Sequence, residues 1–250
     1  MFVRFAVGRA EVVCARHVAD GVRAALDHGT LYRYAEAHPH VRALAGRGIA
    51  YAVPLPKSDE RIVVRHNRHG GMFAPLTRDL FRRPTRAPHE LNTSERLRAA
   101  GVATPVMLGY ILYHVIPGVV RADIFSREIR DSFDLSGILI SPEPADVLHA
   151  WSATHRLVAA LADAGARHRD LNVKNILLHR TPAHGFDAYV LDVDRVEFTE
   201  DRLEANEANI ARLMRSARKW QEVFGAPISD AELGDLETLL RGPQPASTRA

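Results

Sequence analysis

The chain has 250 residues, of which 46% are hydrophobic and 25% charged, and this balance is typical of a globular protein and not of a disordered one. Its single cysteine excludes a disulfide framework and any zinc site built from several cysteines, and it favours a reducing compartment. A formal net charge of +3 with a pI near 9.2 suits an anionic partner such as nucleic acid, acidic lipid or a phosphorylated sugar, without choosing among them.

No segment of the sequence has the pattern of a secretion signal or of a membrane span. The N-terminus lacks a basic segment followed by an apolar one. The longest apolar run, 106–120, is interrupted by His114, Pro117 and Gly118 and is too short to cross a bilayer. We therefore expect a protein that is neither secreted nor integral to a membrane.

The first third of the chain predicts strands and short helices. Residues 19–26 have the spacing of a helix. Gly46 and Gly48 precede the apolar run 49–53, which is the pattern either of a plain hairpin turn or of a loop that covers phosphates between two strands. The third glycine of G-x-G-x-x-G is absent, so the local sequence alone favours the turn. The next predicted strand, 61–65, ends in a cation, Arg65.

A helix is predicted between Pro88 and Gly101, because proline is favoured in the first turn of a helix and glycine just after the last. This helix carries two acidic residues, Glu90 and Glu95. The following run, 106–116, alternates too little for a half-exposed strand and predicts one or two buried strands.

A longer helix is predicted from Ser141 to Gly165, and it leads directly into the segment 168–178. That segment begins His168-Arg169-Asp170-Leu171-Asn172-Val173-Lys174-Asn175 and matches the H-R-D-L-x-x-x-N catalytic loop of protein kinases in residue type and in spacing. In such a loop the Asp acts on the attacking hydroxyl group, and the Asn five positions later holds Mg²⁺ against the ATP phosphates. An ordinary polar turn before a strand is the alternative explanation of the same residues.

A second acidic element follows where the kinase interpretation requires one. The apolar strand 188–191 ends at Asp192, which stands where kinases have the Asp of D-F-G, the main Mg²⁺ ligand. The two elements together predict a site for Mg²⁺ and ATP. Asp170 would deprotonate the acceptor, Asn175 and Asp192 would hold the metal ion, and Lys174 could neutralise charge on the transferred phosphoryl group.

This interpretation gives roles to residues earlier in the chain. Arg65 stands where kinases carry the Lys of V-A-I-K, and a guanidinium can contact phosphate with its planar fork. Its expected acidic partner is Glu90, with Glu95 as the alternative. Gly46 and Gly48 would belong to the loop that covers the phosphates.

The C-terminal part predicts two further helices. The stretch 203–220 has an apolar stripe at helical spacing and basic side chains on its other sides, so a packed helix is the default prediction. Its basic face is a candidate for contact with an anionic membrane or substrate. A short helix is predicted from Ser229 to Leu240, and residues 242–250 are expected to be disordered.

The segments 168–178, 191–195 and 209–216 together resemble the lipopolysaccharide core kinase family, which includes 3-deoxy-D-manno-octulosonic acid (Kdo) kinases and heptose kinases. The resemblance extends over roughly residues 46–220 and implies an α+β, protein-kinase-like fold with two lobes. The expected arrangement is a small, β-rich N-lobe over about 1–114 and a larger, mostly helical C-lobe over about 119–241. A hinge at about 115–118 would bond the adenine, and a buried strand and turn with no ligand fits the same local sequence equally well.

The resemblance also implies an activity, which is phosphorylation by ATP and Mg²⁺ of a sugar hydroxyl of the lipopolysaccharide inner core, most directly Kdo on a lipid A precursor. The acceptor would be a lipid-linked anionic saccharide. The enzyme would be cytoplasmic and peripheral at the inner membrane, with no nucleic acid as partner. Two alternative functions remain: a kinase of the same fold that acts on heptose, a small molecule or a protein, and a non-catalytic nucleotide-binding relative. The presence of Asp170, Asn175 and Asp192 argues against the non-catalytic alternative. The sequence does not give the oligomeric state.

Overall fold

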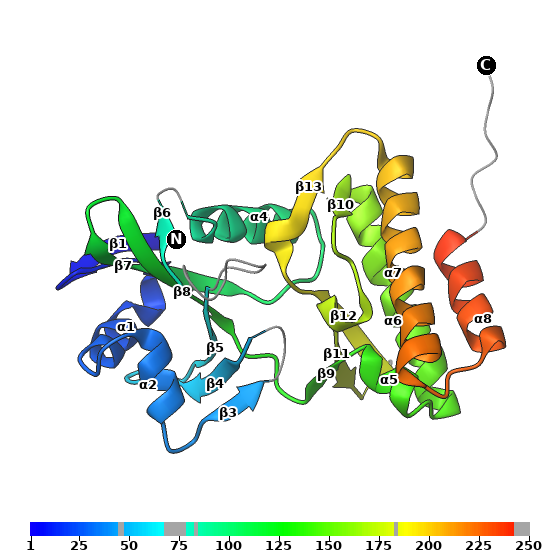
Figure 1. The fold of residues 1–250 in the computed structure, drawn as a ribbon, viewed down its shortest axis with the longest axis horizontal. Coiled ribbons are helices and arrows are strands. Elements are labelled where there is room, and N and C mark those ends of the chain that lie inside the picture. Colours follow the sequence, from blue (N-terminus) through cyan, green and yellow to red (C-terminus); the bar gives the residue numbers. More distant parts are fainter. Residues whose placement is uncertain (45–47, 68–78, 83–84, 183–184, 243–250) are drawn as a thin grey trace. The chain divides into compact units, whose positions relative to one another are not determined.

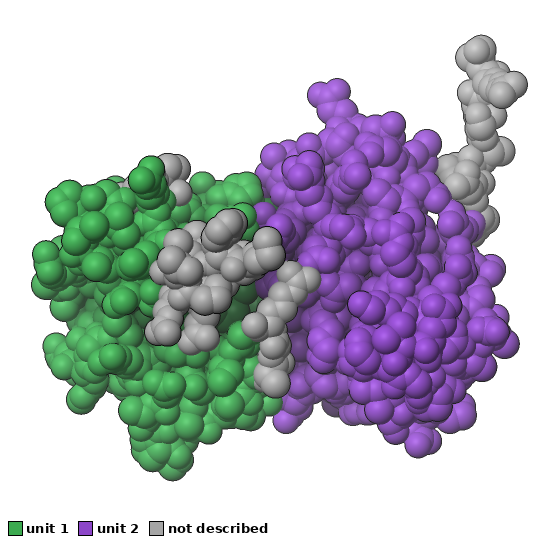
Figure 2. Space-filling view, in the orientation of Figure 1, with its two compact units in different colours: residues 1–94, 105–128 green, residues 95–104, 129–250 purple. Residues whose placement is uncertain are grey.

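A computed structural model describes residues 1–44, 48–67, 79–82, 85–182 and 185–242 (Figure 1). The chain divides into two compact units (Figure 2). Unit 1 comprises Met1–Ser94 and Pro105–Glu128, and unit 2 comprises Glu95–Thr104 and Ile129–Ala250. Helix α4, Ala87–Ala99, begins in unit 1 and ends in unit 2.

Unit 1 is built on an antiparallel sheet of eight strands, in the order β1-β2-β7-β8-β5-β4-β3, with β6 also paired to β8. The strands are β1 Phe2–Val7, β2 Ala10–Ala15, β3 Arg42–Leu44, β4 Ala50–Pro54, β5 Arg61–His66, β6 Phe81–Arg82, β7 Met107–Ile116 and β8 Val119–Arg127. The short 3₁₀ turn η1, Arg16–Val18, leads from β2 into the helices α1, Ala19–Leu26, and α2, Leu31–Ala37. The observed bounds of α1 are those predicted from the sequence.

Helices cover both faces of this sheet, and this explains why the apolar run 106–116 lacks alternation. Buried residues of α1 and α2 pack with Ile111 of β7 in one cluster. Leu91 of α4 packs with Tyr110 and Leu112 of the same strand in a second cluster. Successive residues of a strand point to opposite faces, so a strand that is covered on both sides is apolar throughout.

The expected hinge at about 115–118 does not coincide with the boundary between the units. β7 and β8 form a hairpin whose last register pair is Ile116 with Val119, so Pro117 and Gly118 make its turn inside unit 1. Gly118 has φ of 78°, a left-handed conformation that suits glycine. The apolar residues of β8 complete the sheet beside β7, and after this hairpin the chain stays in unit 1 as far as Glu128.

Unit 2 is mostly helical and has two small antiparallel sheets, β10-β13 and β12-β11-β9. Its helices are α5 Ser136–Ile140, α6 Pro144–Asp163, α7 Arg202–Phe224 and α8 Asp230–Arg241. Its strands and 3₁₀ turns are β9 Ser132–Asp134, β10 Ala166–His168, η2 Val173–Asn175, β11 Ile176–Thr181, β12 Gly185–Val190, η3 Val193–Arg195 and β13 Val196–Phe198. One hydrophobic core joins α6, α7 and α8 to these strands, and Trp151 is buried in it.

The ends of the two C-terminal helices follow the chemistry of their capping residues. α7 begins after Asp201, whose carboxylate accepts a hydrogen bond from the Glu204 N–H at 2.9 Å, and it ends at Gly225 in the left-handed conformation. α8 begins with a capping box of Ser229 and Glu232. Among the described helices none is long and apolar enough to cross a membrane. The predicted disorder of the tail concerns residues 242–250, of which 243–250 lie outside the described part of the chain.

Candidate active site

The candidate catalytic loop lies between β10 and β11 in unit 2, and a fully buried histidine holds it in place. His168 Nε2 lies 2.9 Å from the carbonyl oxygen of Leu191, and Nδ1 accepts a hydrogen bond from the Asp170 N–H at 3.1 Å. These partners require the neutral tautomer with its proton on Nε2. Burial lowers the pKa of His168 below its ordinary value, in agreement with a neutral ring. The histidine therefore links the loop to the segment that carries Asp192.

The backbone of Asp170 is fixed on its carbonyl side as well. Its carbonyl oxygen accepts hydrogen bonds from the side-chain amides of Asn172, at 2.9 Å, and Asn175, at 2.8 Å. Asn172 also accepts from the Lys174 N–H at 3.0 Å and so starts the 3₁₀ turn η2. The loop thus positions Asp170 through a closed set of local hydrogen bonds.

Asn175 and Asp192 lie on neighbouring segments, because the Leu191 N–H donates to the Asn175 carbonyl at 2.9 Å. The Asn175 side-chain nitrogen is engaged with Asp170, so Oδ1 is the atom that would bind a cation. Asp192 has φ of 51° and ψ of 46°, a left-handed conformation that Asp and Asn tolerate better than most residues.

The donor set at this position suits Mg²⁺ bound together with phosphate. Mg²⁺ is commonly held by one or two carboxylates plus phosphate oxygens and water. Asn175 and Asp192 offer one amide oxygen and one carboxylate, and in the described part of the chain no cluster of three or more His, Cys, Asp or Glu side chains forms a metal site of its own. These two residues therefore fit a metal ion that also binds the phosphates.

Lys174 is held beside the loop by two contacts. Its Nζ lies 3.3 Å from Oδ2 of Asp134 and 5.2 Å from the centre of the Trp220 ring. About half of the side chain is exposed, so the ammonium can reach a ligand at the loop.

Helix α7 supports the candidate site through three side chains on one face. Asn209 Oδ1 accepts from the His168 N–H at 2.9 Å, Ser216 Oγ accepts from the Val173 N–H at 3.3 Å, and Trp220 contacts Lys174. These three roles were not predicted from the sequence. The available signal was Asn209 itself, a polar residue four positions before Leu213 in the apolar stripe of a predicted helix.

Unit 1 carries the residues predicted to bind the phosphates of ATP. The guanidinium of Arg65, at the end of β5, donates to the carboxylate of Glu90 on α4. Glu95, the alternative, lies 3.2 Å from Arg98. The expected pairing of Arg65 with Glu90 is therefore confirmed. The carboxylate of Glu90 is buried and the guanidinium is partly exposed, so the pair can present a fixed cation to a ligand.

The predicted glycine turn falls between β3 and β4, which are antiparallel neighbours. Gly46 lies outside the described residues. Gly48 is exposed, and a Cβ atom at this position would meet no atom within 4 Å. A side chain would thus fit at 48 in this structure, and the covering of phosphate by this turn stays a prediction.

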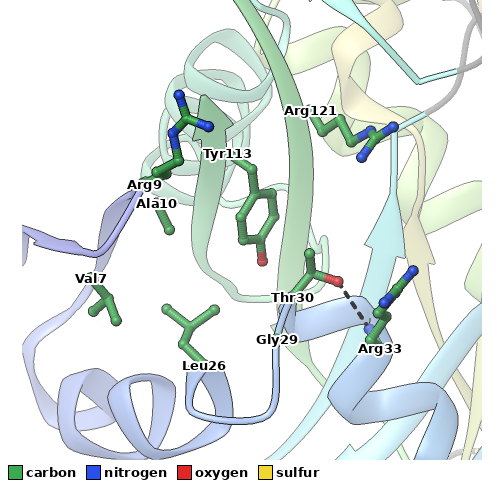
Figure 3. A pocket seen from close by; sticks show the side chains of 9 residues that line it. All are labelled: Val7, Arg9, Ala10, Leu26, Gly29, Thr30, Arg33, Tyr113 and Arg121. Atoms are coloured by element: carbon green, nitrogen blue, oxygen red, sulfur yellow. Dashed lines mark hydrogen bonds between the residues drawn. The ribbon is translucent and has the colours of Figure 1, made fainter. Parts of the chain in front are cut away.

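Unit 1 also contains a cavity of about 410 Å³ that is lined by apolar side chains and by three arginines. Figure 3 shows Val7 and Leu26 on one side of it and Arg33 and Arg121 on the other. The residues that line it are Val7, Arg9, Ala10, Leu26, Gly29, Thr30, Arg33, Tyr113 and Arg121.

A buried polar network leads from this cavity to β5. The Tyr113 hydroxyl donates to Asp123 Oδ2 at 2.8 Å, and Asp123 Oδ1 lies 2.6 Å from His66 Nδ1. The other ring nitrogen of His66 is 3.0 Å from Asp79. Burial opposes a charge on His66, but the hydrogen bonds and charges of Asp123 and Asp79 outweigh burial and raise the pKa of the imidazole. The network ends next to Arg65 in the chain.

Sequence comparison relates this chain to kinases of lipopolysaccharide. A sequence model described as "Lipopolysaccharide kinase (Kdo/WaaP) family" matches residues 33–236. The 3-deoxy-D-manno-octulosonic acid kinase of Actinobacillus succinogenes is 29% identical over 205 residues, which is 80% of this chain and 82% of that protein. The enzyme of the same name from Xylella fastidiosa strain M12 is 31% identical over 208 residues, 81% of this chain and 78% of its own length.

Comparison with solved structures gives the fold. WaaP, solved in complex with acyl carrier protein, superposes with a TM-score of 0.52 at 19% identity, over 85% of this chain and 83% of that one. The expected α+β, protein-kinase-like fold is thereby confirmed. The four candidate residues Asp170, Lys174, Asn175 and Asp192 belong to unit 2, and Gly48, Arg65 and Glu90 belong to unit 1.

Proposed function

Because the chain belongs to the lipopolysaccharide kinase (Kdo/WaaP) family and is a phosphotransferase, we propose that it transfers the γ-phosphoryl group of ATP to a hydroxyl group of Kdo on a lipid-linked inner-core saccharide. The proposal is supported above all by the buried contacts that join the loop around Asp170 to the segment that carries Asp192. His168 and Asn175 bond to Leu191, so Asp170 and Asp192 are placed by one connected structure. Kinase chemistry needs such positioning more than it needs covalent catalysis.

Asp170 would accept the proton of the acceptor hydroxyl as its oxygen attacks the γ-phosphorus in line. The bond from that phosphorus to the β-phosphate oxygen breaks, and ADP leaves with the electron pair. Asn175 and Asp192 would hold Mg²⁺, which when bound neutralises charge on the phosphates. Lys174 would neutralise charge on the transferred group.

The residues of unit 1 would bind the rest of the nucleotide. Arg65 would hold the α and β phosphates with its guanidinium fork, and Glu90 would orient that fork. Gly46 and Gly48 would lie in the turn that covers the phosphates.

The acceptor chemistry suggests where the enzyme works. A Kdo residue carries a carboxylate and is attached here to a lipid, so the acceptor is an anion at a membrane surface. We propose that the protein is cytoplasmic and contacts the inner membrane peripherally, and its pI near 9.2 suits such a surface.

The test is the substitution Asp170→Asn, measured for nucleotide binding and for transfer. An amide of the same shape keeps the loop's backbone bonds but cannot accept the proton. Turnover on Kdo-linked lipid A precursor should fall by about a hundred- to ten-thousand-fold. The affinity for Mg²⁺-ATP, measured by calorimetry, should stay close to that of wild type.

Asp163→Asn, at the exposed end of α6, is the matched control and should leave both quantities unchanged. Wild-type transfer to a heptose acceptor, an aminoglycoside or a protein in place of Kdo would reassign the substrate. Nucleotide binding without transfer to any acceptor would indicate a non-catalytic relative. Equal turnover of wild type and Asp170→Asn would remove the assigned base.

A further inference from the structure

Helix α7 carries a cationic stripe directly beside the face that supports the catalytic loop. At about 100° per residue, Asn209, Ser216 and Trp220 lie on one side of the helix. Their contacts with His168, Val173 and Lys174 fix that side against the loop.

The cationic stripe consists of Arg212, Arg215 and Lys219, spaced by three and four residues. All three are exposed. The stripe covers about 10 Å of the helix, since each residue adds about 1.5 Å. Its side of the helix adjoins the side that contacts the loop, because Arg212 is four positions before Ser216 and Lys219 is three positions after it.

The charges of this stripe are not neutralised within the part of the chain that the structure describes. There, no ion pair joins Arg212, Arg215 or Lys219 to a carboxylate, and the one acidic residue three or four positions away from any of them is Glu222, three positions after Lys219. Arg218, on another side of α7, behaves differently: its guanidinium lies 2.5 Å from Glu237 on α8. Like charges at helical spacing repel, so the stripe favours an anionic ligand.

We infer that the cationic stripe binds the anionic groups of the acceptor saccharide, its carboxylates and phosphates, while the acceptor hydroxyl lies at Asp170. This inference rests on the proposed function. The neighbouring loop contacts favour the acceptor over a distant ligand, because Ser216, which contacts the loop at Val173, lies one helical turn from Arg212 and from Lys219. Exposed Val223 and Phe224, 64% and 59% accessible, end the same helix and suit a ligand with an apolar anchor.

The test replaces the stripe by neutral helix formers in the triple variant Arg212→Gln, Arg215→Gln, Lys219→Gln. Exposed charge pairs are individually weak, and three of them together should raise KM for lipid-linked Kdo acceptor by about tenfold. KM for ATP and kcat at saturating acceptor should stay unchanged. The dependence of kcat/KM on NaCl should also become shallower, since salt screens such pairs. Arg218→Gln removes one charge from the same helix and should change none of these quantities.

A second acceptor and a vesicle assay separate the possible ligands. A soluble Kdo glycoside without phosphates should show a smaller change in KM than the phosphorylated glycolipid. The competing ligand is the bilayer itself. Loss of sedimentation with anionic vesicles, with no change in KM for acceptor in detergent micelles, would assign the stripe to lipid headgroups and overturn the inference.

The experiments distinguish an error in the proposed function from an error in this inference. If wild type phosphorylates no Kdo acceptor, the proposed function is wrong, and direct binding of the glycolipid in micelles still decides the role of the stripe. Equal glycolipid affinity of wild type and triple variant would overturn the inference. A circular dichroism spectrum equal to that of wild type establishes that the triple variant is folded.

Discussion

The side-chain amide of Asn209 makes two hydrogen bonds to one edge of the strand that leads into the candidate catalytic loop, accepting from the His168 N–H and donating to the Ala166 carbonyl, each at 2.9 Å. The amide is fully buried, so water cannot replace it if it is removed. An apolar residue of similar size would leave two buried backbone groups without this partner. We therefore expect the fold of unit 2 and the position of His168 to depend on this one side chain.

Asn209→Leu should lower the free energy of unfolding by roughly 2 to 6 kcal/mol, since each of the two buried backbone groups that lose their partner costs about 1 to 3 kcal/mol. Urea unfolding followed by circular dichroism measures the change. Asn206→Leu, at a half-buried position one turn earlier, should cost less than about 1 kcal/mol. Equal losses in the two variants would show that the hydrogen bonds of Asn209 are not the cause.

The pair Arg65 and Glu90 should behave as one unit in nucleotide binding. Arg65→Gln and Glu90→Gln should each raise KM for ATP. The KM of the double variant should be only slightly higher than that of the single variant with the larger effect. A double-mutant cycle should give a coupling free energy above about 1 kcal/mol. The cycle of Arg65 with Glu95 is the control and should be additive within about 0.5 kcal/mol, because Glu95 lies beside Arg98. Additivity in both cycles would separate Glu90 from the function of Arg65.

The proposed metal ligands should show their role in the dependence of turnover on Mg²⁺. Asp192→Asn removes a charge but keeps a residue that tolerates the left-handed backbone, and Asn175→Ala removes the amide oxygen. Both variants should need more Mg²⁺ for half-maximal turnover and should lose about a hundredfold or more in kcat. A circular dichroism spectrum checks that each is folded.

Asp131 offers a matched control for Asp192. It is exposed, it lies in unit 2, and it also has a left-handed backbone, with φ of 48°. Asp131→Asn should therefore leave turnover and its Mg²⁺ dependence unchanged. An unaltered Mg²⁺ dependence in both Asp192→Asn and Asn175→Ala would remove the metal site from the mechanism.

His66 should make the stability of the protein fall as the pH rises above about 6.5, the ordinary pKa of histidine in an unfolded chain. The pKa of His66 is raised in the folded protein, because Asp123 and Asp79 outweigh the effect of burial. A raised pKa contributes stability that is complete below 6.5 and is lost as the pH passes through the folded value. Because His66 binds one proton, it can change the free energy of unfolding by at most about 1.4 kcal/mol per pH unit.

His66→Gln should remove this slope, as measured by urea unfolding at several pH values from 6 upward. His168 acts in the opposite sense, because its lowered pKa costs stability below 6.5, so the two histidines act in different pH ranges. An unchanged slope above 6.5 in His66→Gln would show that its network does not retain the proton.

The local features of the site could be predicted from the sequence, and the long-range ones could not. The H-R-D pattern predicted that Asp170 and Asn175 share one loop, because only five positions separate them, and the structure bonds the Asn175 amide to the Asp170 carbonyl. The pairing of Arg65 with Glu90 was predicted because the kinase pattern supplied an acidic helix after a cationic strand, and the structure confirms it.

Contacts between residues far apart in the chain had no such pattern. Tyr113, Asp123 and His66 meet only because β5, β7 and β8 are neighbours in the sheet, an order that is not visible in their separate sequences. The expected hinge failed for a related reason. Pro117-Gly118 is as typical of a hairpin turn as of a linker, and only the pairing of β8 with β7 distinguishes the two.

The three loop contacts of α7 also constrain the length of this helix. Asn209, Ser216 and Trp220 face the same way only while seven and four residues separate them. Inserting one residue between Asn209 and Ser216 would rotate everything beyond it by about 100° and advance it by about 1.5 Å. Asn209 could then still hold His168, but Ser216 and Trp220 would turn away from Val173 and Lys174, and the cationic stripe would turn with them. Single-residue insertions in this part of α7 should therefore be tolerated less well than substitutions at its exposed positions.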